Sequence, residues 1–184
     1  MRLFIAINFP EELKEKIGKT IEKIVSDFPQ VSWTKKENTH LTLKFFGYVN
    51  ENQLEKIKEG IGKSIEGVKP FSLTFTNLGF FDREQLIIWV GLNDCPELMK
   101  MVNNLEKEME KLGFAKEKRI YSPHVTLGRG KKLSRETSQK IRNIISQETK
   151  NISLQFKVSE ISLVESRLAA TGPKYFSLSQ FALS

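Results

Sequence analysis

One short pattern, His-x-Thr-Leu, occurs twice in the 184 residues, as HLTL at 40–43 and HVTL at 124–127, and it contains both histidines of the chain. Each copy follows an earlier apolar run at nearly the same distance. The first motif histidine lies 37 residues after Leu3, and the second lies 38 residues after Leu86. Self-similarity at a fixed spacing indicates an internal duplication. We therefore expect two halves that fold alike.

Hydropathy patterns predict the order strand, helix, strand, helix, strand in each half. In the first half we expect strands over 3–7, 31–33, 40–47 and 71–75, with helices over 11–28 and 54–65. In the second half we expect strands over 86–90, 124–128, 152–158 and 175–183, with helices over 94–113 and after Ser134. This order predicts an α+β chain.

Local signals set some of the expected element boundaries. Asn50 and Gln53 have the spacing of a capping box before the helix at 54, and Gly113 is suited to end the helix before it. Ser134 is suited to begin the last helix. The apolar alternation slips by one residue before Ile161, which predicts a β-bulge or a bend there.

Composition narrows the class of protein. No apolar run approaches the roughly 18 residues of a membrane span, and the opening ten residues are typical of a first strand rather than a signal peptide. Cys95 is the single cysteine, so no intramolecular disulfide is possible. We expect an intracellular, cytoplasmic protein that is a monomer and has no membrane partner. The net charge of +7 favours a polyanionic partner.

The two motifs suggest acid–base chemistry. Residues i and i+2 of a strand point to the same face, so each histidine stands beside its threonine while the aliphatic residues point into the core. Duplicated strands can bring His40, Thr42, His124 and Thr126 face to face across a cleft. Two imidazoles that exchange protons near neutral pH, with two hydroxyl donors between them, suit in-line displacement at phosphorus.

Two other interpretations of the histidines stay open at this stage. They could be structural residues at sheet edges, with threonine present for its β propensity. A metal site of two histidines and a carboxylate is the other, but the nearest acids, Glu37 and Glu117, lie outside both motifs. We expect no metal and no cofactor.

Basic residues lie close to both motifs, where they would attract phosphate. Around the second motif the chain has Lys116, Lys118, Arg119, Arg129, Lys131, Lys132 and Arg135 against the single acid Glu117. Arg129 follows the second motif histidine by five residues, and a guanidinium can grip phosphate or stack on a base.

Paired His-x-Thr-x motifs, one per half, resemble those of the 2H phosphoesterase superfamily. The longer stretches resemble its RNA 2',3'-cyclic phosphodiesterase branch, also called 2'-5' RNA ligase-like. These stretches are RLFIAINFP at 2–10, ENTHLTLKFFG at 37–47, LGFF at 78–81, IIWVGL at 87–92 and SPHVTLGR at 122–129. The resemblance implies one bilobal domain over 1–184, with approximate halves 1–82 and 83–184 and antiparallel sheets that face a central cleft.

The resemblance also implies roles for individual residues. His40 would protonate the departing 3' oxygen and His124 would activate water, while Thr42 and Thr126 would hold the nonbridging phosphate oxygens. Further contacts to the RNA are expected from Arg129, Phe80, Phe81, Lys131 and Lys132. The implied reaction opens an RNA or nucleoside 2',3'-cyclic phosphate to a 2'-phosphomonoester without a metal.

The exact substrate stays open, and so do two rival functions. The partner would be RNA with 2',3'-cyclic phosphate or 2'-phosphate ends, including tRNA fragments, and the reverse 2'-5' ligation could also occur. One rival is a noncatalytic domain that binds RNA ends. The other is a related phosphodiesterase for 2'-5' oligonucleotides or nucleotide-sugar cyclic phosphates.

Overall fold

The computed structural model describes residues 1–25, 28–82, 85–131, 133–148, 154–170 and 172–184. Its strands are β1 (Arg2–Asn8), β2 (Val31–Trp33), β3 (His40–Tyr48), β4 (Phe71–Asp82), β5 (Leu86–Leu92), β6 (His124–Gly130), β7 (Gln155–Val158), β8 (Glu160–Ala169) and β9 (Gly172–Ala182). Its helices are α1 (Glu11–Val25), α2 (Leu54–Ser64), α3 (Pro96–Lys111) and α4 (Arg135–Glu148), with short 3-10 turns η1 (Lys36–Asn38) and η2 (Glu51–Gln53). The expected α+β class is confirmed.

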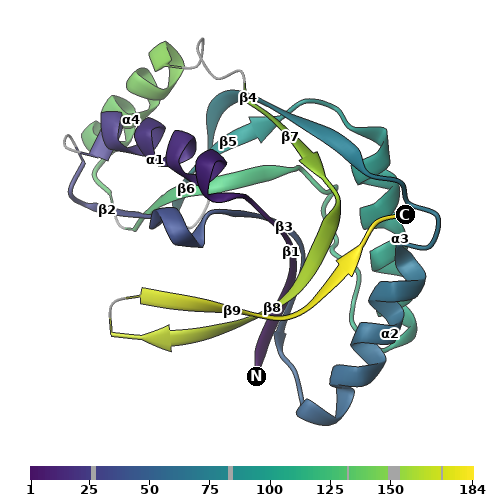
Figure 1. Cartoon of the computed structure of the whole chain (residues 1–184). Helices are drawn as coiled ribbons and strands as arrows, with labels where there is room; N and C mark the ends of the chain where they lie inside the picture. The colour runs from purple at the N-terminus through teal and green to yellow at the C-terminus, as the bar shows by residue number, and fades with distance from the viewer. Residues whose placement is uncertain (26–27, 83–84, 132, 149–153, 171) are drawn as a thin grey trace.

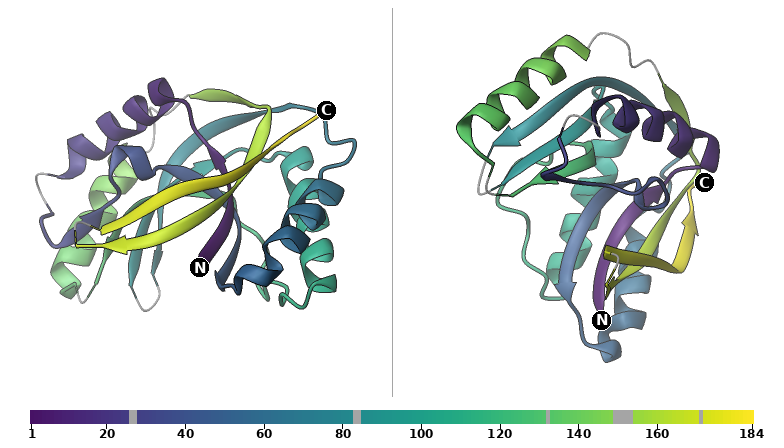
Figure 2. Two further views of the ribbon diagram at one scale, coloured as in Figure 1. Left: turned by 60° about the horizontal axis from the view of Figure 1, so that its bottom comes forward. Right: turned by 90° about the vertical axis from the view of Figure 1, so that its left-hand side faces the viewer.

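The strands form two antiparallel sheets. One has the order β3-β1-β8-β9 and the other β2-β6-β5-β4-β7. Helices α1 and α4 lie together on one side of the molecule, and α2 packs on α3 on the other side (Figure 1). Figure 2 shows the β8–β9 hairpin extending beyond the rest of its sheet. Each sheet takes strands from both sequence halves, so the two sheets do not coincide with residues 1–82 and 83–184.

One large apolar core connects the two sheets, and a small second cluster of Phe4, Ala6 and Val164 lies apart from it. The aliphatic residues of both motifs, Leu41, Leu43, Val125 and Leu127, are all buried in it. They pack with the inward residues of β1 and β5 and with the apolar stripes of the helices. The motif strands therefore present their aliphatic side chains to the core, as the alternation predicts, and their polar side chains to the other face.

Both motif strands contain a β-bulge at the same position. In the β1–β3 pair, Ala6 lies opposite Thr42 and Ile5 lies opposite Lys44, so Leu43 has no partner residue. In the β5–β6 pair, the same kind of shift leaves Leu127 without a partner. A bulge adds one residue to a strand and reverses the alternation beyond it. The fourth residue of each motif is therefore the point where the strand changes phase.

Several expected boundaries differ from the structure. Helix α1 ends at Val25 instead of residue 28, and β4 continues to Asp82 instead of ending at residue 75. The slip before Ile161 is not a bulge within one strand, because the chain leaves the β7 edge of one sheet there and enters the other as β8. Residues 152 and 153 of the expected strand lie outside the described residues.

The helix-capping predictions are confirmed at two of three positions. Ser134 Oγ accepts the Thr137 N–H at 3.1 Å, and Gly113 follows α3 with a φ of 87° that favours glycine. The capping box at Asn50 and Gln53 is wrong, because neither side chain makes a capping hydrogen bond and the 3-10 turn η2 begins directly after Asn50.

The bulge at Leu43 turns Lys44 away from the open face and into the protein. Its Nζ lies 2.7 Å from Glu106 Oε2 on α3 and 3.1 Å from the Ala115 carbonyl oxygen, and its side chain is only 5% exposed. Glu106 also accepts the Glu117 N–H at 3.3 Å. This buried ion pair joins the first motif strand to α3 and to the segment that leads to the second motif.

We expect Glu106→Leu to destabilise the fold by about 3–5 kcal/mol, because it leaves the buried Lys44 ammonium without a counter-charge. The double variant Lys44→Met, Glu106→Leu should recover most of that loss. Urea unfolding measures both. The matched control is Glu12→Ala, which removes an exposed pair with Lys16 of the same 2.7 Å length and should have little effect. An equal loss in Glu106→Leu and in this control would contradict the role of the buried pair.

Candidate active site

The two motifs lie in one open cleft of about 610 Å³ between the sheets. Its lining includes the motif residues His40, Thr42, His124 and Thr126. The other residues that line it are Arg2, Phe4, Thr34, Asn38, Phe45, Gln85, Arg129, Lys131, Ser166, Leu168, Pro173 and Tyr175. The structure therefore brings together both His-Thr pairs and two of the cations that the sequence singles out.

His40 has hydrogen bonds at both ring nitrogens. Its Nδ1 lies 2.7 Å from the Asn38 carbonyl oxygen, and its Nε2 lies 3.0 Å from Thr42 Oγ1. A carbonyl oxygen can only accept, so Nδ1 carries a proton. In the neutral ring Nε2 is then the acceptor, and the Thr42 hydroxyl donates to it.

His124 is held in the same way from its own strand. Its Nδ1 lies 2.8 Å from the Ser122 carbonyl oxygen, two residues before it, as Asn38 is two residues before His40. The same tautomer follows for both rings, with the proton of the neutral form on Nδ1. In both neutral imidazoles Nε2 is thus the acceptor atom, and that of His40 is engaged by the Thr42 hydroxyl.

Each imidazole is in contact with two aromatic side chains from other strands of its own sheet. The His40 ring lies 4.9 Å from Phe4 and 5.2 Å from Tyr175, measured between ring centroids. The His124 ring lies 5.0 Å edge-on from Phe81 and 6.5 Å from Trp89. These rings remove water from one side of each imidazole while the other side faces the cleft.

Burial lowers the pKa of both histidines from the ordinary value. For His40, desolvation is the largest cause, and the positive charges of Lys14 and Arg129 lower the pKa further. For His124, desolvation again dominates, with an added lowering from Arg129. The hydrogen bonds to the Asn38 and Ser122 carbonyls oppose both shifts. The free site therefore favours neutral imidazoles.

Tyr121 connects the two half-sites. Its hydroxyl donates to the Thr42 carbonyl oxygen at 2.8 Å, and the next residue, Ser122, supplies the carbonyl that holds His124. Burial raises the pKa of Tyr121, so its phenol stays a neutral donor. The connection fixes the segment before the second motif against the strand of the first.

The cations differ in their placement. Arg129 and Lys131 line the cleft, and Arg129 reaches it because the bulge at Leu127 reverses the alternation of β6. Lys116, expected in the same basic cluster, forms a 2.7 Å ion pair with Glu110 instead. Lys132 lies outside the described residues.

Phe80 and Phe81 point to opposite faces of β4. Phe81 stands beside the His124 ring, at the edge of the site. Phe80 is partly buried against the core on the helix side, with the Arg142 guanidinium 5.3 Å from its ring centroid. The structure thus places Phe80 away from the cleft, because adjacent residues of a strand alternate between its faces.

Sequence reasoning missed Phe45, which is half exposed and lines the cleft. Simple alternation from His40 puts residue 45 in the core, and only the bulge at Leu43 returns it to the cleft. One signal in the sequence could have found it. Phe45 follows His40 by five residues, as Arg129 follows His124, so the duplication relates the two positions.

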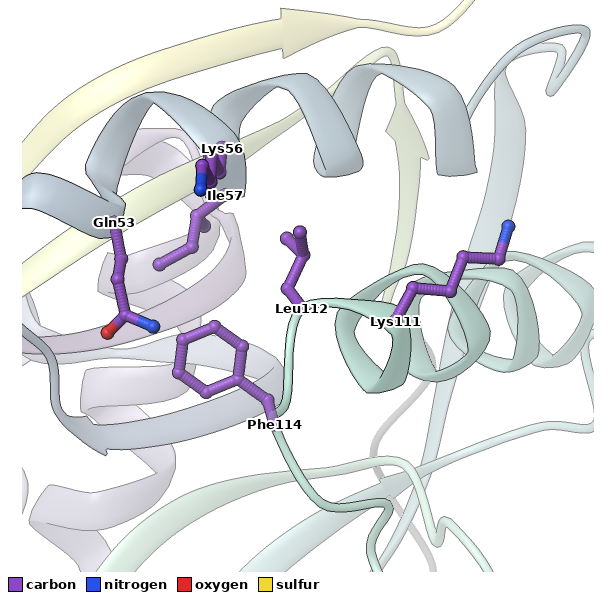
Figure 3. A pocket seen from close by; sticks show the side chains of 6 residues that line it. All are labelled: Gln53, Lys56, Ile57, Lys111, Leu112 and Phe114. Carbon is purple, nitrogen blue, oxygen red and sulfur yellow. The ribbon is translucent and has the colours of Figure 1, made fainter.

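A second cavity of about 210 Å³ lies apart from the motifs, between α2 and the end of α3 (Figure 3). Its lining residues are Gln53, Lys56, Ile57, Lys111, Leu112 and Phe114.

Within the described ranges, no group of three or more His, Cys, Asp or Glu side chains is arranged to hold a metal ion. In that same part of the chain, no helix is long and apolar enough to cross a membrane.

Solved structures share this architecture over the whole chain. A crystal structure described as a phosphoesterase matches with a TM-score of 0.83 and 25% identity, covering 100% of this chain and 98% of the other. E. coli LigT complexed with 3'-AMP matches with a TM-score of 0.82 and 25% identity, at the same coverage. The two-sheet fold with one motif per sheet is that of the 2H phosphoesterases.

The chain belongs to the 2'-5' RNA ligase superfamily, whose family model matches residues 9–169. A protein of Methanothermobacter thermautotrophicus named RNA 2',3'-cyclic phosphodiesterase is 32% identical over 186 residues, covering 100% of this chain and 99% of the relative. A protein of Methanocaldococcus jannaschii with the same name is 33% identical over 178 residues, covering 95% and 96%. The family resemblance noted in the sequence is confirmed.

In a titration of the free protein followed by NMR, we expect both imidazoles to have a pKa below the reference value of about 6.5. Inorganic phosphate should raise both, since an anion within 4–6 Å favours the charged ring. Arg129→Gln should also raise both, because it removes a positive charge that lowers them. A histidine of the free protein that titrates above the reference value would contradict the assignment.

Proposed function

We propose that this chain is a phosphodiesterase that hydrolyses the 2',3'-cyclic phosphate at an RNA end to a 2'-phosphomonoester. The observation that carries the proposal is the pair of imidazoles, each held at Nδ1 by the carbonyl two residues earlier, with Nε2 left for one shared cleft. Curated relatives that match the whole chain, and are named RNA 2',3'-cyclic phosphodiesterase, support it.

The reaction uses both histidines in opposite protonation states. Neutral His124 takes a proton from water through Nε2, and the water oxygen attacks phosphorus opposite the 3' oxygen. His40, protonated at Nε2, gives that proton to the 3' oxygen as the P–O3' bond breaks. The product carries a 2'-phosphomonoester and a free 3'-hydroxyl, and the two histidines have exchanged protonation states.

Thr42 and Thr126 stabilise the charge that develops on the nonbridging oxygens, because each hydroxyl lies on the same strand face as its histidine. Thr42 donates to His40 in the free site. Once His40 is protonated, its Nε2 no longer accepts, so the Thr42 hydroxyl turns to the phosphate. Binding of the anion and charging of His40 are in this way coupled.

The remaining cleft residues bind the nucleotide. Arg129 and Lys131 supply positive charge for the phosphates, and the half-exposed ring of Phe45 offers a surface on which a base stacks. Phe45 takes the role of contacting the base that was expected of one aromatic of the Phe80–Phe81 pair, and Phe80 points to the helix side of β4. Phe81 supports the His124 ring from its edge.

The same groups serve the reverse 2'-5' ligation. A 5'-hydroxyl of a second RNA takes the place of water, and its oxygen attacks the cyclic phosphate while His124 removes its proton. Fragments of tRNA that end in a cyclic phosphate fit the proposed substrate class. Both motifs belong to one chain, so catalysis by a monomer is sufficient.

Replacing either motif histidine with alanine should lower turnover of a nucleoside 2',3'-cyclic phosphate by about 10²–10⁴-fold, the usual contribution of a general acid or base. The p-nitrophenyl diester of a nucleoside 2'-phosphate separates the roles, because nitrophenolate replaces the departing 3' oxygen and leaves without a proton. We expect this substrate to rescue His40→Ala and not His124→Ala. Nitrophenol release and chromatography of the nucleotide product measure both.

Each other outcome has a defined meaning. Rescue of His124→Ala alone would reverse the acid and base roles. Binding of the cyclic phosphate by the wild type without turnover would support the noncatalytic RNA-end-binding domain. Turnover of only a nucleotide-sugar cyclic phosphate or a 2'-5' oligonucleotide in a substrate panel would change the substrate class while keeping the mechanism.

The pH profile of kcat/KM should be bell-shaped, since one histidine must start neutral and the other charged. Burial lowers both pKa values in the free protein, so its maximum should lie below about pH 6.5. The bound phosphate anion raises both, so the kcat profile should lie at higher pH than the kcat/KM profile. A kcat/KM maximum clearly above pH 7 would contradict the assigned electrostatics.

A further inference from the structure

The cleft face of the first motif strand continues beyond the catalytic pair. A second register shift in the β1–β3 pair places Phe4 opposite Phe45 and Leu3 opposite Gly47, which leaves Phe46 without a partner. Gly47 has a φ of 75°, a conformation that favours glycine at such a bulge. After this shift the strand changes phase once more, and Tyr48 lies directly opposite Arg2.

This register places Tyr48 on the same face as Arg2, because directly opposite residues of an antiparallel pair share a face. Arg2 lines the cleft. The next residue, Val49, is buried and points the other way. Two bulges within one strand thus put Phe45 and Tyr48, three residues apart, on the cleft face in line with Thr42.

Exposure separates Tyr48 from the other aromatics of the site. Its side chain is 82% exposed, compared with 50% for Phe45, and Phe4 is buried. A ring so exposed adds little to folding, because it removes little apolar area from water. The two aromatic rings form an open surface that begins at the catalytic pair and ends at the far end of β3.

Arg2 lies opposite Tyr48 in the strand register and beside the Phe45 ring. Its Cζ is 5.0 Å from the Phe45 ring centroid, and none of the ion pairs of the described residues involves it. The Met1 amino group donates to the Val49 carbonyl oxygen at 2.9 Å, which fixes this end of β1 against β3. A guanidinium without a carboxylate, beside two exposed rings, suits a phosphodiester that links two bases.

We propose that Tyr48 and Arg2 form a subsite for the nucleotide that precedes the terminal one, with Tyr48 stacking its base and Arg2 holding the connecting phosphodiester. The subsite rests on the proposed function, since it extends the cleft in which the cyclic phosphate reacts. Phe45 lies opposite Phe4 and Tyr48 opposite Arg2, two residues apart on β1, so the two positions are roughly 7 Å apart at about 3.3 Å per residue, a distance that adjacent nucleotides can span. The preferred substrate is therefore an oligoribonucleotide and not a mononucleotide.

The test compares a nucleoside 2',3'-cyclic phosphate with a dinucleotide that ends in the same cyclic nucleotide. For the wild type we expect a higher kcat/KM on the dinucleotide. Tyr48→Ala should lower that value about tenfold, within the range found when a base-stacking aromatic is replaced, and leave the mononucleotide unchanged. Tyr48→Phe should keep the dinucleotide advantage, because stacking uses the ring and not the hydroxyl. The high exposure of Tyr48 means that neither variant disturbs the core.

The matched control is Phe176→Ala on β9. Phe176 is 41% exposed and adjoins Tyr175, which lines the cleft, so its ring points to the opposite face of the strand. We expect this variant to behave as the wild type on both substrates. An unchanged dinucleotide advantage in Tyr48→Ala would overturn the subsite. Loss of the dinucleotide advantage in Lys131→Ala and not in Tyr48→Ala would also overturn the subsite, because the RNA would then leave the cleft toward Lys131.

Failure of the proposed function gives a different result. If the wild type hydrolyses neither cyclic phosphate, the phosphodiesterase assignment is wrong, and binding then decides the subsite. The probe is a dinucleotide with a terminal 2'-phosphate. About tenfold weaker binding in Tyr48→Ala and unchanged binding in Phe176→Ala would support the subsite, and equal binding by the wild type and Tyr48→Ala would overturn it.

Discussion

The unpaired residue at the fourth position of each motif is the constraint on which the rest of the site depends. A regular strand beginning at His40 would give Lys44 to the cleft and Phe45 to the core. The extra residue Leu43 reverses both, so the lysine forms a buried ion pair with Glu106 while Phe45 faces the cleft. At Leu127 the same kind of bulge orients Arg129 toward the cleft. One backbone irregularity, used twice, thus joins an aliphatic core to a polar cleft in a single strand.

The electrostatics of the cleft follow from this geometry. Aromatic neighbours desolvate both imidazoles, and Arg129 adds positive charge near each, so the empty site holds them neutral. An acid–base pair needs one charged member at the start, and a phosphodiester supplies the missing favourable interaction when it binds. The protonated His40 is therefore stabilised mainly when substrate is present. The same cations that lower the pKa of the histidines attract the anion that raises it again.

The sequence predicts the fold class, the order of elements and the residues at the centre of the site. Those predictions depend on the spacing of apolar residues and on a motif that contains both histidines. The spacing is a reliable signal because the apolar face of each helix or strand must be buried. It fails wherever the backbone changes phase. Phe45 and Tyr48 lie on the cleft face because of bulges, which the alternation of apolar residues in this strand does not show. Phe80 and Phe81 could not be told apart, since the face of each depends on register within β4. The exchange of strands between the two sheets is a further property of tertiary structure that alternation does not contain.

The two motif strands share the same backbone pattern, but they differ in the side chain that follows each motif histidine by five residues. Each motif strand supplies a histidine, a threonine, a bulged leucine and then, five residues after the histidine, one further cleft residue, which is Phe45 in one half and Arg129 in the other. An aromatic ring stacks on a base and a guanidinium holds a phosphate, so the two ends of the cleft differ in what they bind. His40 also has a second hydrogen bond, to Thr42 Oγ1 at 3.0 Å. In the proposed reaction, a cyclic phosphate bound between unlike ends enters in one orientation, and that orientation decides which imidazole faces the leaving 3' oxygen and which faces water.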